Sequence, residues 1–397
     1  MIETNENLEG KKWSTRGGSA FAGKNLHIGL LFSYGLSLEK WDEAGLLARD
    51  TQLYTELMVQ GAKISFITYG DKSEQNIGNK LGLSVISNTK KLYKPFYYLF
   101  LNIIKYRELK KVDIIKSHQF IGVWPAVVMK IFFGKIYIAR GGYIPSFFAK
   151  NSNKKSIRSY VKYIFAVVDE YMACKFADVV VVPSQEEIDY LKKKYNLKDK
   201  KAKINTNWID TDLFKPDLNI KKKSNSVIFV GRFEEQKNPL IFLKSIKDIP
   251  NINATMVGAG SLLNVINSFI EENNIKCNVY TNRISNQDLP QILNQHEVYV
   301  LPTKFEGGSP KTILEAMSCG LPVISTNSFG TKNAFVNKVH GIKTELSIDD
   351  MRNAIKYLLE NPDIRARYGE EGRKYVQKNF SLEKVLKREV EIINSLI

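Results

Sequence analysis

The segment FEGGSPKTILEAMSCGLPVIS, residues 305–325, combines two carboxylates, two adjacent glycines and an apolar run. Ser309 and Pro310 are typical of the N-cap and the first position of a helix, and Gly320 is typical of a helix end. The apolar residues after Gly320 predict a short buried strand. A glycine loop that opens onto the free N–H groups of a helix favours the binding of an anion.

The two carboxylates differ in their position relative to this predicted helix. Glu306 is expected in the loop before the helix, and Glu315 is expected inside it, one turn after Lys311. On one interpretation the segment is an ordinary connection, and Glu315 forms a surface ion pair with Lys311. On the other, the segment is a binding loop. The order of motifs in the rest of the chain discriminates between the two.

A pair of cations follows another predicted strand, in VGRFEEQKNPL (230–240). Gly231 allows a tight turn, and Arg232 and Lys237 are expected to project from the strand end and its loop. Two cations beside a helix N-terminus can hold a diphosphate, because they offset its charge and the extra charge that develops as it leaves. Taken alone, the pair is better explained as solvated surface cations.

Short runs rich in Val and Ile alternate with longer helical patterns, which predicts an α/β protein with parallel, doubly wound sheets. The predicted strands are 26–32, 63–69, 112–117, 135–139, 178–182, 226–230, 254–257, 277–280, 297–301 and 321–326. The segment 205–226 has no period and predicts a linker. The predicted domains are therefore 1–204 and 205–379, and an amphipathic helix at 380–397 is expected to pack back on the first.

The three cysteines, Cys174, Cys277 and Cys319, are far apart and have no metal-ligand spacing. This argues for a reducing compartment and against a disulfide framework or structural zinc. The N-terminal MIETNENLEGKKW lacks a signal-peptide pattern, and the chain has no apolar run long enough to span a bilayer. The expected location is the cytoplasm.

Most of the formal net charge of +17 lies in one window. Between Lys90 and Lys162, sixteen Lys and Arg residues stand against Glu108 and Asp113, so the window carries +14. A basic surface with interleaved aromatics suits membrane headgroups or nucleic acid, whereas a solvated charged face is the plainer alternative. The aromatic residues expected at a membrane are Phe96, Tyr97, Tyr98, Phe100, Phe147 and Phe148.

Five motifs in order resemble the retaining, nucleotide-sugar-dependent glycosyltransferases of family 4. They are NWIDTDLFKP, VGRFEEQK, MVGAGSL, NRISNQDLP and YVLPTKFEGGSPKTILEAMSCGLPVIST, and they cover the second predicted domain. KWDEAGLLARDTQLYTELMVQGAKISFIT, DIIKSH and ADVVVVPSQ extend a weaker resemblance over the first. The resemblance implies a GT-B fold, in which two Rossmann-like domains face each other across a cleft. The donor site would lie mainly on the second domain and the acceptor site mainly on the first.

The resemblance also implies roles for individual residues. Arg232 and Lys237 fall on the positions that hold the donor diphosphate, and Glu315 falls on the glutamate that accepts from the ribose hydroxyls. Glu306 falls on the glutamate beside the transferred sugar. The implied catalytic residues are thus Glu306, Arg232 and Lys237. Further implied or possible contacts are Gly35, Gly307, Gly308 and Ser309 for the donor, and His118 and Arg140 on the sugar and acceptor side.

The sequence departs from the family pattern at three places. Eight residues separate Glu306 from Glu315, where seven are usual. Arg140 and Gly141 stand where the family commonly has His-Gly, and Asn333 replaces an acidic residue after GTK. These differences leave the diphosphate and ribose positions in place and bear on the identity of the sugar.

The predicted function is retaining transfer of a hexose or N-acetylhexosamine from a nucleoside-diphosphate sugar, with UDP as the expected nucleotide. The expected acceptor is a lipid-linked or surface-polysaccharide glycan, presented to a protein bound peripherally at the anionic inner face of the cytoplasmic membrane. No cofactor or metal is expected, because side-chain cations would stabilise the leaving diphosphate and no DxD-like acidic cluster follows a strand.

Two alternatives remain open from the sequence. One is a nucleotide-sugar epimerase of the same architecture, which the fold alone does not exclude. The other is a basic nucleic-acid-binding protein. The linker and paired-glutamate motifs favour transfer over epimerisation, and the chain shows no recognisable nucleic-acid module, so no nucleic-acid partner is expected.

Overall fold

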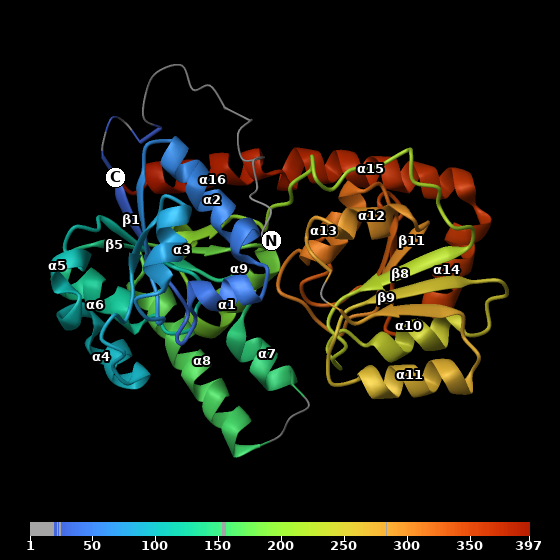
Figure 1. Cartoon of the computed structure of the whole chain (residues 1–397), viewed down its shortest axis with the longest axis horizontal. Helices are drawn as coiled ribbons and strands as arrows, with labels where there is room; N and C mark the ends of the chain where they lie inside the picture. Colours follow the sequence, from blue (N-terminus) through green and yellow to red (C-terminus); the bar gives the residue numbers. More distant parts are fainter. Residues whose placement is uncertain (1–19, 22, 24, 153–155, 283) are drawn as a thin grey trace.

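The computed structural model describes residues 20–21, 23, 25–152, 156–282 and 284–397 (Figure 1). The chain forms two α/β domains, each built on one parallel sheet. The predicted fold class is therefore confirmed. The predicted lack of a signal peptide falls mostly on residues 1–19, which lie outside the described residues.

The first domain contains a seven-stranded sheet in the order β3-β2-β1-β4-β5-β6-β7, with every neighbouring pair parallel. Its strands are β1 His27–Leu31, β2 Lys63–Ile67, β3 Ser84–Ile86, β4 Ile114–Ser117, β5 Ile136–Arg140, β6 Val179–Val182 and β7 Ala202–Ile204. The strand order reverses between β1 and β4, which is the switch point where ligands of doubly wound sheets bind.

Helices cover both faces of this sheet because successive strand residues point to opposite sides. In β6, Val179 and Val181 join a core with α1, α2 and α16, whereas Val180 and Val182 join a core with α4, α6, α8 and α9. The helices of this half are α1 Leu38–Glu43, α2 Leu47–Val59, α3 Glu74–Lys80, α4 Lys94–Ile104, α5 Tyr106–Leu109, α6 Trp124–Phe133, α7 Pro145–Asn151, α8 Ile157–Phe176 and α9 Gln185–Tyr195, with a 3-10 turn at Asp199–Lys201.

The second domain contains a six-stranded parallel sheet in the order β10-β9-β8-β11-β12-β13. Its strands are β8 Ser226–Val230, β9 Asn253–Val257, β10 Cys277–Tyr280, β11 Val298–Leu301, β12 Val323–Thr326 and β13 Gly341–Thr344. Its helices are α10 Pro239–Ile246, α11 Leu263–Glu272, α12 Leu289–Asn294, α13 Lys311–Ser318, α14 Ile348–Glu360 and α15 Pro362–Phe380. No helix in the described part of the chain has the length and hydropathy needed to span a bilayer.

The chain crosses between the domains twice, and the two crossings touch. The first runs through Ile209, whose N–H donates to the carbonyl of Phe380 at 2.8 Å on the return crossing. After Ser381, α16 (Leu382–Asn394) lies on the first domain (Figure 1). Its Ile392 and Ile393 belong to the core of that domain. The end of the chain therefore fastens the two domains together.

A buried ion pair holds α16 in place. Lys116 Nζ on β4 lies 2.5 Å from Glu389 Oε1, and the two side chains are 1% and 2% exposed. Asn205 donates to the other carboxylate oxygen at 2.9 Å. Burial raises the pKa of Glu389, but Lys116 and these hydrogen bonds outweigh it, so the pKa is lowered. Lys116 therefore adds no charge to the surface, contrary to its inclusion in the basic window.

We expect Glu389→Ala to destabilise the first domain, because it leaves a buried ammonium without its partner. Removal of one member of a buried pair costs about 3–5 kcal/mol. The measurement is urea unfolding followed by tryptophan fluorescence. The matched control is Glu391→Ala, an exposed position on the same helix, where a change below about 0.5 kcal/mol is expected. Equal losses in both variants would contradict the importance of the pair.

Candidate active site

The loop after β8 brings a cation to one of the two motif glutamates. Lys237 Nζ lies 2.6 Å from Glu306 Oε1, and the side chains are 12% and 7% exposed. Asn238 takes a left-handed conformation, with φ of 56°, and Pro239 then begins α10. The structure thus joins two predicted site residues that are 69 positions apart in the sequence.

Arg232 lies on the same loop but is exposed. Its guanidinium donates to Gln236 Oε1 at 2.9 Å, and Gln236 in turn donates to the carbonyl of Phe305 at 2.8 Å. Gln236 therefore ties the cation loop to the residue before Glu306. Gln236 was not predicted as a site residue, because a glutamine in a polar loop gives no signal of its contact.

The loop that carries Glu306 lies against the segment after β12. The N–H of Glu306 donates to the carbonyl of Phe329 at 2.8 Å. Gly330 has a φ of 82°, and a Cβ there would lie 2.2 Å from the carbonyl oxygen of Glu306, so only glycine fits. Ser309 has a φ of 52°, and α13 begins at Lys311 with Pro310 as its N-cap. The predicted N-cap role of Ser309 is therefore wrong.

Two of the three N–H groups expected to face a ligand are bonded within the protein. The N–H of Gly308 donates to Glu187 Oε1 at 3.2 Å, and the N–H of Ser309 donates to the carbonyl of Gly330 at 3.2 Å. At Gly307, a Cβ would lie 2.6 Å from the carbonyl oxygen of Gly142 in the first domain. The first domain thus closes directly on this loop, and the expectation that Gly308 and Ser309 present free N–H groups is not met.

Two carboxylates at the start of α9 reach across from the first domain. Glu187 is fully buried, accepts from Gly308 and also accepts from Ser184 Oγ at 3.1 Å. Glu186 accepts from the N–H of Gly330 at 2.8 Å. Burial raises the pKa of Glu187 to about 7, although its hydrogen bonds oppose the shift. Neither glutamate was predicted as a site residue.

An aromatic cluster continues the same contact between the domains. Phe147 on α7 stacks on Phe329 with ring centroids 4.2 Å apart, and Phe148 meets Phe305 edge-on at 5.0 Å. The expectation that Phe147 and Phe148 face a membrane is therefore wrong. Tyr97 is also fully buried, so it does not belong to a membrane surface either.

Glu315 lies inside α13 and is buried. Its pKa is raised by burial, with Arg49 and Lys311 acting in the opposite direction. Lys311 forms its ion pair with Asp50 of the first domain at 3.3 Å and lies over the ring of Trp208. The interpretation of Glu315 and Lys311 as a surface ion pair is therefore wrong. Among the described residues, no hydrogen bond to the Glu315 carboxylate is present, which leaves it free to accept from a ligand.

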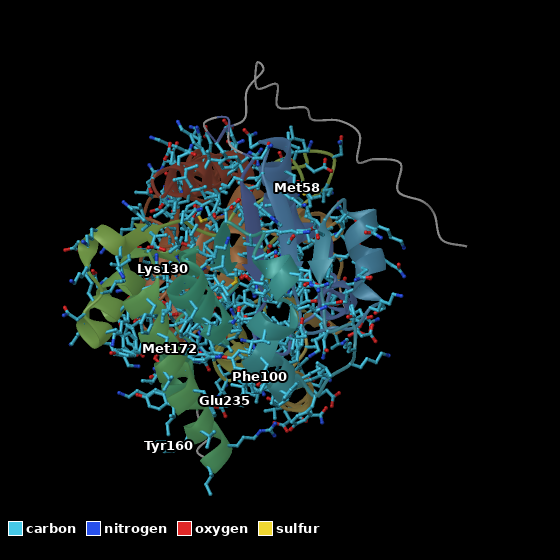
Figure 2. The ribbon with its side chains drawn as sticks, turned by 90° about the vertical axis from the view of Figure 1, so that its left-hand side faces the viewer. Met58, Phe100, Lys130, Tyr160, Met172 and Glu235 are labelled. Atoms are coloured by element: carbon cyan, nitrogen blue, oxygen red, sulfur yellow. The ribbon has the colours of Figure 1, made fainter. Side chains whose placement is uncertain are left out.

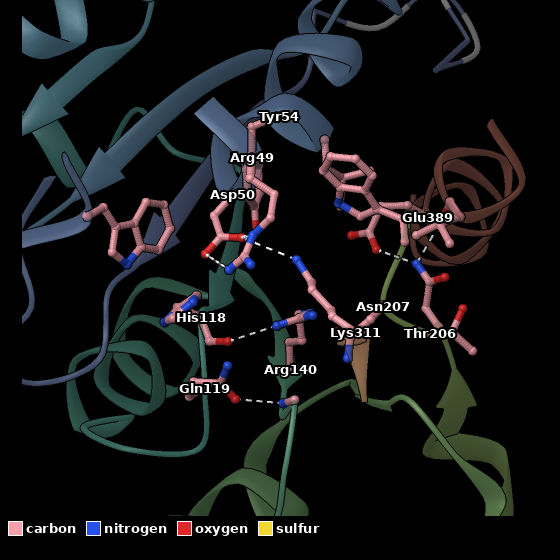
Figure 3. A pocket seen from close by; sticks show the side chains of 16 residues that line it. Arg49, Asp50, Tyr54, His118, Gln119, Arg140, Thr206, Asn207, Lys311 and Glu389 are labelled. Carbon is pink, nitrogen blue, oxygen red and sulfur yellow. Dashed lines mark hydrogen bonds and ion pairs between the residues drawn. The ribbon is translucent and has the colours of Figure 1, made fainter. Parts of the chain in front are cut away.

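A pocket of about 260 Å³ lies between the first domain, the linker and α13 (Figure 3). Its lining combines aromatic rings with charged and amide groups. The lining residues are Trp41, Arg49, Asp50, Leu53, Tyr54, His118, Gln119, Arg140, Gly142, Asn205, Thr206, Asn207, Trp208, Lys311, Val385 and Glu389. Aromatic faces beside polar groups suit a sugar ring, which has both apolar and hydroxyl surfaces.

The pocket contains both residues predicted on the sugar and acceptor side. His118 Nδ1 lies 3.3 Å from Ser33 Oγ, and burial lowers its pKa to about 3, with Arg140 acting in the same direction. Arg140 donates to the carbonyl of His118 at 3.3 Å (Figure 3). His118 is therefore uncharged at neutral pH, and Arg140 supplies the positive charge. Gly35 does not line this pocket, and its carbonyl accepts from Lys40 at 2.7 Å.

Within the described residues, no group of three or more His, Cys, Asp or Glu side chains could hold a metal ion. The three cysteines have no part in this site. Cys174 and Cys319 are buried in the domain cores, and Cys277 lies on β10.

The fold and the site together define a class of protein. Two parallel, doubly wound sheets that face each other, joined by a paired crossing and enclosing a polar pocket, are the GT-B architecture. The family model for "Glycosyl transferases group 1" matches residues 210–375, and the model for "Glycosyltransferase Family 4" matches residues 51–213. The two models match one domain each, and the chain belongs to the glycosyltransferase family that they describe together. Membership favours transfer over the epimerase and nucleic-acid alternatives.

Several known proteins are similar to this chain. An Escherichia coli protein named UDP-Gal:alpha-D-GlcNAc-diphosphoundecaprenol alpha-1,3-galactosyltransferase is 30% identical over 53% of this chain and 58% of its own length. The chain spans about half the length of the curated relatives it matches. Sucrose-phosphate synthase from Thermosynechococcus elongatus has a TM-score of 0.78 at 20% identity, covering 94% of this chain and 99% of that structure. Anabaena HepE in complex with UDP-glucose has a TM-score of 0.72 at 16% identity, covering 94% and 100%.

Glu187 should make the free energy of unfolding depend on pH. Its pKa is about 7 in the folded protein, against an ordinary value of 4.5. The folded state therefore holds the proton more tightly, and this contribution to the free energy of unfolding falls as pH rises from about 4.5 to about 7. Glu187→Gln keeps an acceptor for Gly308, so it should lessen the loss of stability between these pH values. Urea unfolding at several pH values measures the slope, with Glu391→Gln as the control. Identical slopes in wild type and Glu187→Gln would contradict the assignment.

Proposed function

We propose that this chain is a retaining glycosyltransferase that uses a nucleoside-diphosphate sugar. The observation that carries the proposal is the contact between Lys237 and Glu306 at the strand ends of the second sheet. It puts the cation expected at the donor diphosphate beside the carboxylate expected at the transferred sugar. Glu315 supplies a buried carboxylate for the ribose hydroxyls.

We assign UDP as the nucleotide. The names of two relatives support this choice, since the E. coli protein is named for UDP-Gal and Anabaena HepE was solved with UDP-glucose. The sugar would be a hexose or an N-acetylhexosamine. The polar pocket of about 260 Å³ is not lined by Glu306, Lys237 or Glu315, so we assign it to a sugar ring of the acceptor, beside Trp41, Tyr54 and Trp208.

The proposed reaction breaks the bond between the anomeric carbon and the diphosphate oxygen. Arg232 and Lys237 would offset the charge that develops on the leaving diphosphate. In this step Lys237 would leave Glu306 and bind a phosphate oxygen instead. Glu306 would then accept a hydrogen bond from a sugar hydroxyl. The acceptor hydroxyl attacks the same face and passes its proton to the departing phosphate, which retains the configuration. The contact of Phe147 and Phe148 with the donor loop would exclude water from the sugar.

The proposed acceptor is a lipid-linked or surface-polysaccharide glycan that meets the first domain at His118 and Arg140. The E. coli relative is named for an acceptor on diphosphoundecaprenol, which supports a lipid carrier. A lipid carrier is confined to a bilayer, so the protein would work at the inner face of the cytoplasmic membrane, bound peripherally.

We expect two variants to separate the diphosphate and ribose roles. Arg232→Ala should weaken both UDP-glucose and inorganic diphosphate, whereas Glu315→Gln should weaken UDP-glucose and leave inorganic diphosphate unchanged. The loss of a charge-assisted hydrogen bond of about 1.5–3 kcal/mol corresponds to about ten- to a hundredfold in affinity. Calorimetric titration measures both ligands, with Lys247→Ala, an exposed cation of the same domain, as the control. Equal weakening of both ligands by Glu315→Gln would contradict its ribose role.

Transfer should not require a divalent metal, because the groups that offset the leaving charge are Arg232, Lys237 and the N–H groups at the start of α13. We expect turnover of the labelled nucleotide sugar to be unchanged within a factor of about two after treatment with EDTA. A complete loss of turnover that added Mg²⁺ or Mn²⁺ reverses would contradict this.

A further inference from the structure

Exposed apolar side chains concentrate on one side of the first domain. In the described residues, 26 large hydrophobic side chains are exposed, and 16 of them lie between Tyr93 and Tyr171. They lie on α4, α6 and α8 and beside these helices, and α6 packs against both of the others. Figure 2 shows this side, with Phe100 on α4, Lys130 on α6, and Tyr160 and Met172 on α8. Such a concentration of exposed apolar side chains on neighbouring helices marks a site of interaction.

Helix α8 provides the largest part of this surface. Its outer row includes Ile157 and Phe165, which are 86% and 66% exposed. The full outer row, at helical spacings of three and four, is Ile157, Val161, Ile164, Phe165, Val168 and Tyr171. In Figure 2 the end of this helix at Tyr160 projects beyond the body of the domain. The row therefore forms an apolar ridge that no other part of the described chain covers.

Hydrogen bonds on the inner face of α8 fix the rotation of this helix about its axis. Asp169 accepts from the N–H of Gly122 at 2.8 Å, and Glu170 accepts from the N–H of Ser146 at 2.7 Å. Both carboxylates are buried, and both would lose their partners if the helix rotated. The exposure of the outer row is thus fixed by polar contacts on the opposite side.

Cations border the ridge. Arg158 and Lys162 lie among the outer residues of α8, and Lys94, Arg107, Lys110 and Lys111 are exposed on or next to α4 and α5. The basic window is less charged at its surface than its sequence indicates. Lys116 is buried with Glu389, and Lys130 pairs with Asp178. The remaining exposed cations nevertheless lie next to the apolar side chains, with only Glu108 and Asp113 as exposed acids in the window.

We propose that the ridge of α8, with the outer faces of α4 and α6, is the surface by which this protein docks on an anionic bilayer. The apolar row would enter the boundary between headgroups and acyl chains, and the cations would meet the phosphates. The inference rests on the proposed function, because a lipid-linked acceptor would lie in the same bilayer. A second copy of the chain fits less well, since a two-fold contact brings cation against cation with few acids to pair them.

Helix α8 packs against α7, and α7 contacts the second domain next to the loop that carries Glu306. Glu170 on α8 holds Ser146 at the start of α7, and the next residue, Phe147, stacks on Phe329. Phe329 in turn accepts from the N–H of Glu306. Helix α8 is therefore linked through Ser146, Phe147 and Phe329 to the loop that carries Glu306.

The test is sedimentation of the full chain with vesicles of phosphatidylglycerol and phosphatidylethanolamine, and with vesicles of phosphatidylcholine alone. We expect binding to the anionic vesicles only, weakened by salt. The double variant Ile157→Ser/Phe165→Ser should lower the affinity at least about tenfold. Replacement of Arg158 and Lys162 by Gln should lower it about fivefold per cation and reduce its salt dependence. The matched control is Val265→Ser/Tyr280→Ser, two exposed apolar positions on the second domain.

Binding of UDP-glucose measured on the same proteins separates this inference from the proposed function. The α8 variants should bind UDP-glucose as the wild type does, since none of these residues lines the site. The inference is overturned if the wild type ignores anionic vesicles at low salt, or if the control variant loses as much binding as the α8 variant. It is also overturned if the α8 variant turns a dimer into a monomer in analytical ultracentrifugation, or if the protein binds a DNA oligonucleotide while Ile157→Ser/Phe165→Ser leaves vesicle binding unchanged.

Discussion

The loop that carries Glu306 is held from three sides, and the geometry of the candidate site depends on this. Within the second domain, Phe329 and Gly330 accept from its backbone, and Lys237 pairs with its carboxylate. From the first domain, Glu187 accepts from Gly308. A loop with two adjacent glycines has high conformational entropy, so several partners are needed to fix one conformation. The position of Glu306 is therefore a property of both domains together.

The charged groups at the contact between the two domains also depend on both domains. Arg49 and Lys311 both contact Asp50, and the two cations keep the pKa of that carboxyl well below its usual range although burial acts against them. Burial also lowers the pKa of Lys311 to about 8. Three partly buried charges thus share one contact between the domains. An added anion would stabilise the charged form of Lys311. The diphosphate of a nucleotide sugar or of a lipid-linked acceptor would supply such an anion.

Much of the fold could be predicted from the sequence, because buried strands of a parallel sheet are continuous apolar runs. All ten predicted strands are present. The three that were missed, β3, β7 and β13, have three or four residues and are edge strands, and Ser84 and Lys203 on two of them are exposed. Such short, half-solvated strands carry little periodic signal.

The candidate site was predicted less completely than the fold. Motif order identified Arg232, Lys237, Glu306 and Glu315, because their spacing is readable along the chain. Glu187 could not be found in this way, since a glutamate in the first turn of a helix is ordinary, and only the approach of the two domains gives it Gly308 as a partner. Lys311 was paired with Glu315 for the same reason. The sequence shows that Glu315 lies one helical turn away, but it does not show that Asp50 lies across the interface.

The pair of Lys237 and Glu306 has a further consequence for the proposed reaction. Each group neutralises the other at 2.6 Å, so neither charge lies unpaired in a largely buried loop. A bound diphosphate would take Lys237 and release Glu306 for a sugar hydroxyl, and departure of the nucleotide would restore the pair. Donor binding must therefore compete with an existing ion pair. A ligand with both an anion and hydroxyl groups would give Lys237 and Glu306 each a new partner. Free phosphate would pair with Lys237 and leave Glu306 unpaired. At the proposed donor site, the pair would thus favour the intact nucleotide sugar over its anionic fragments.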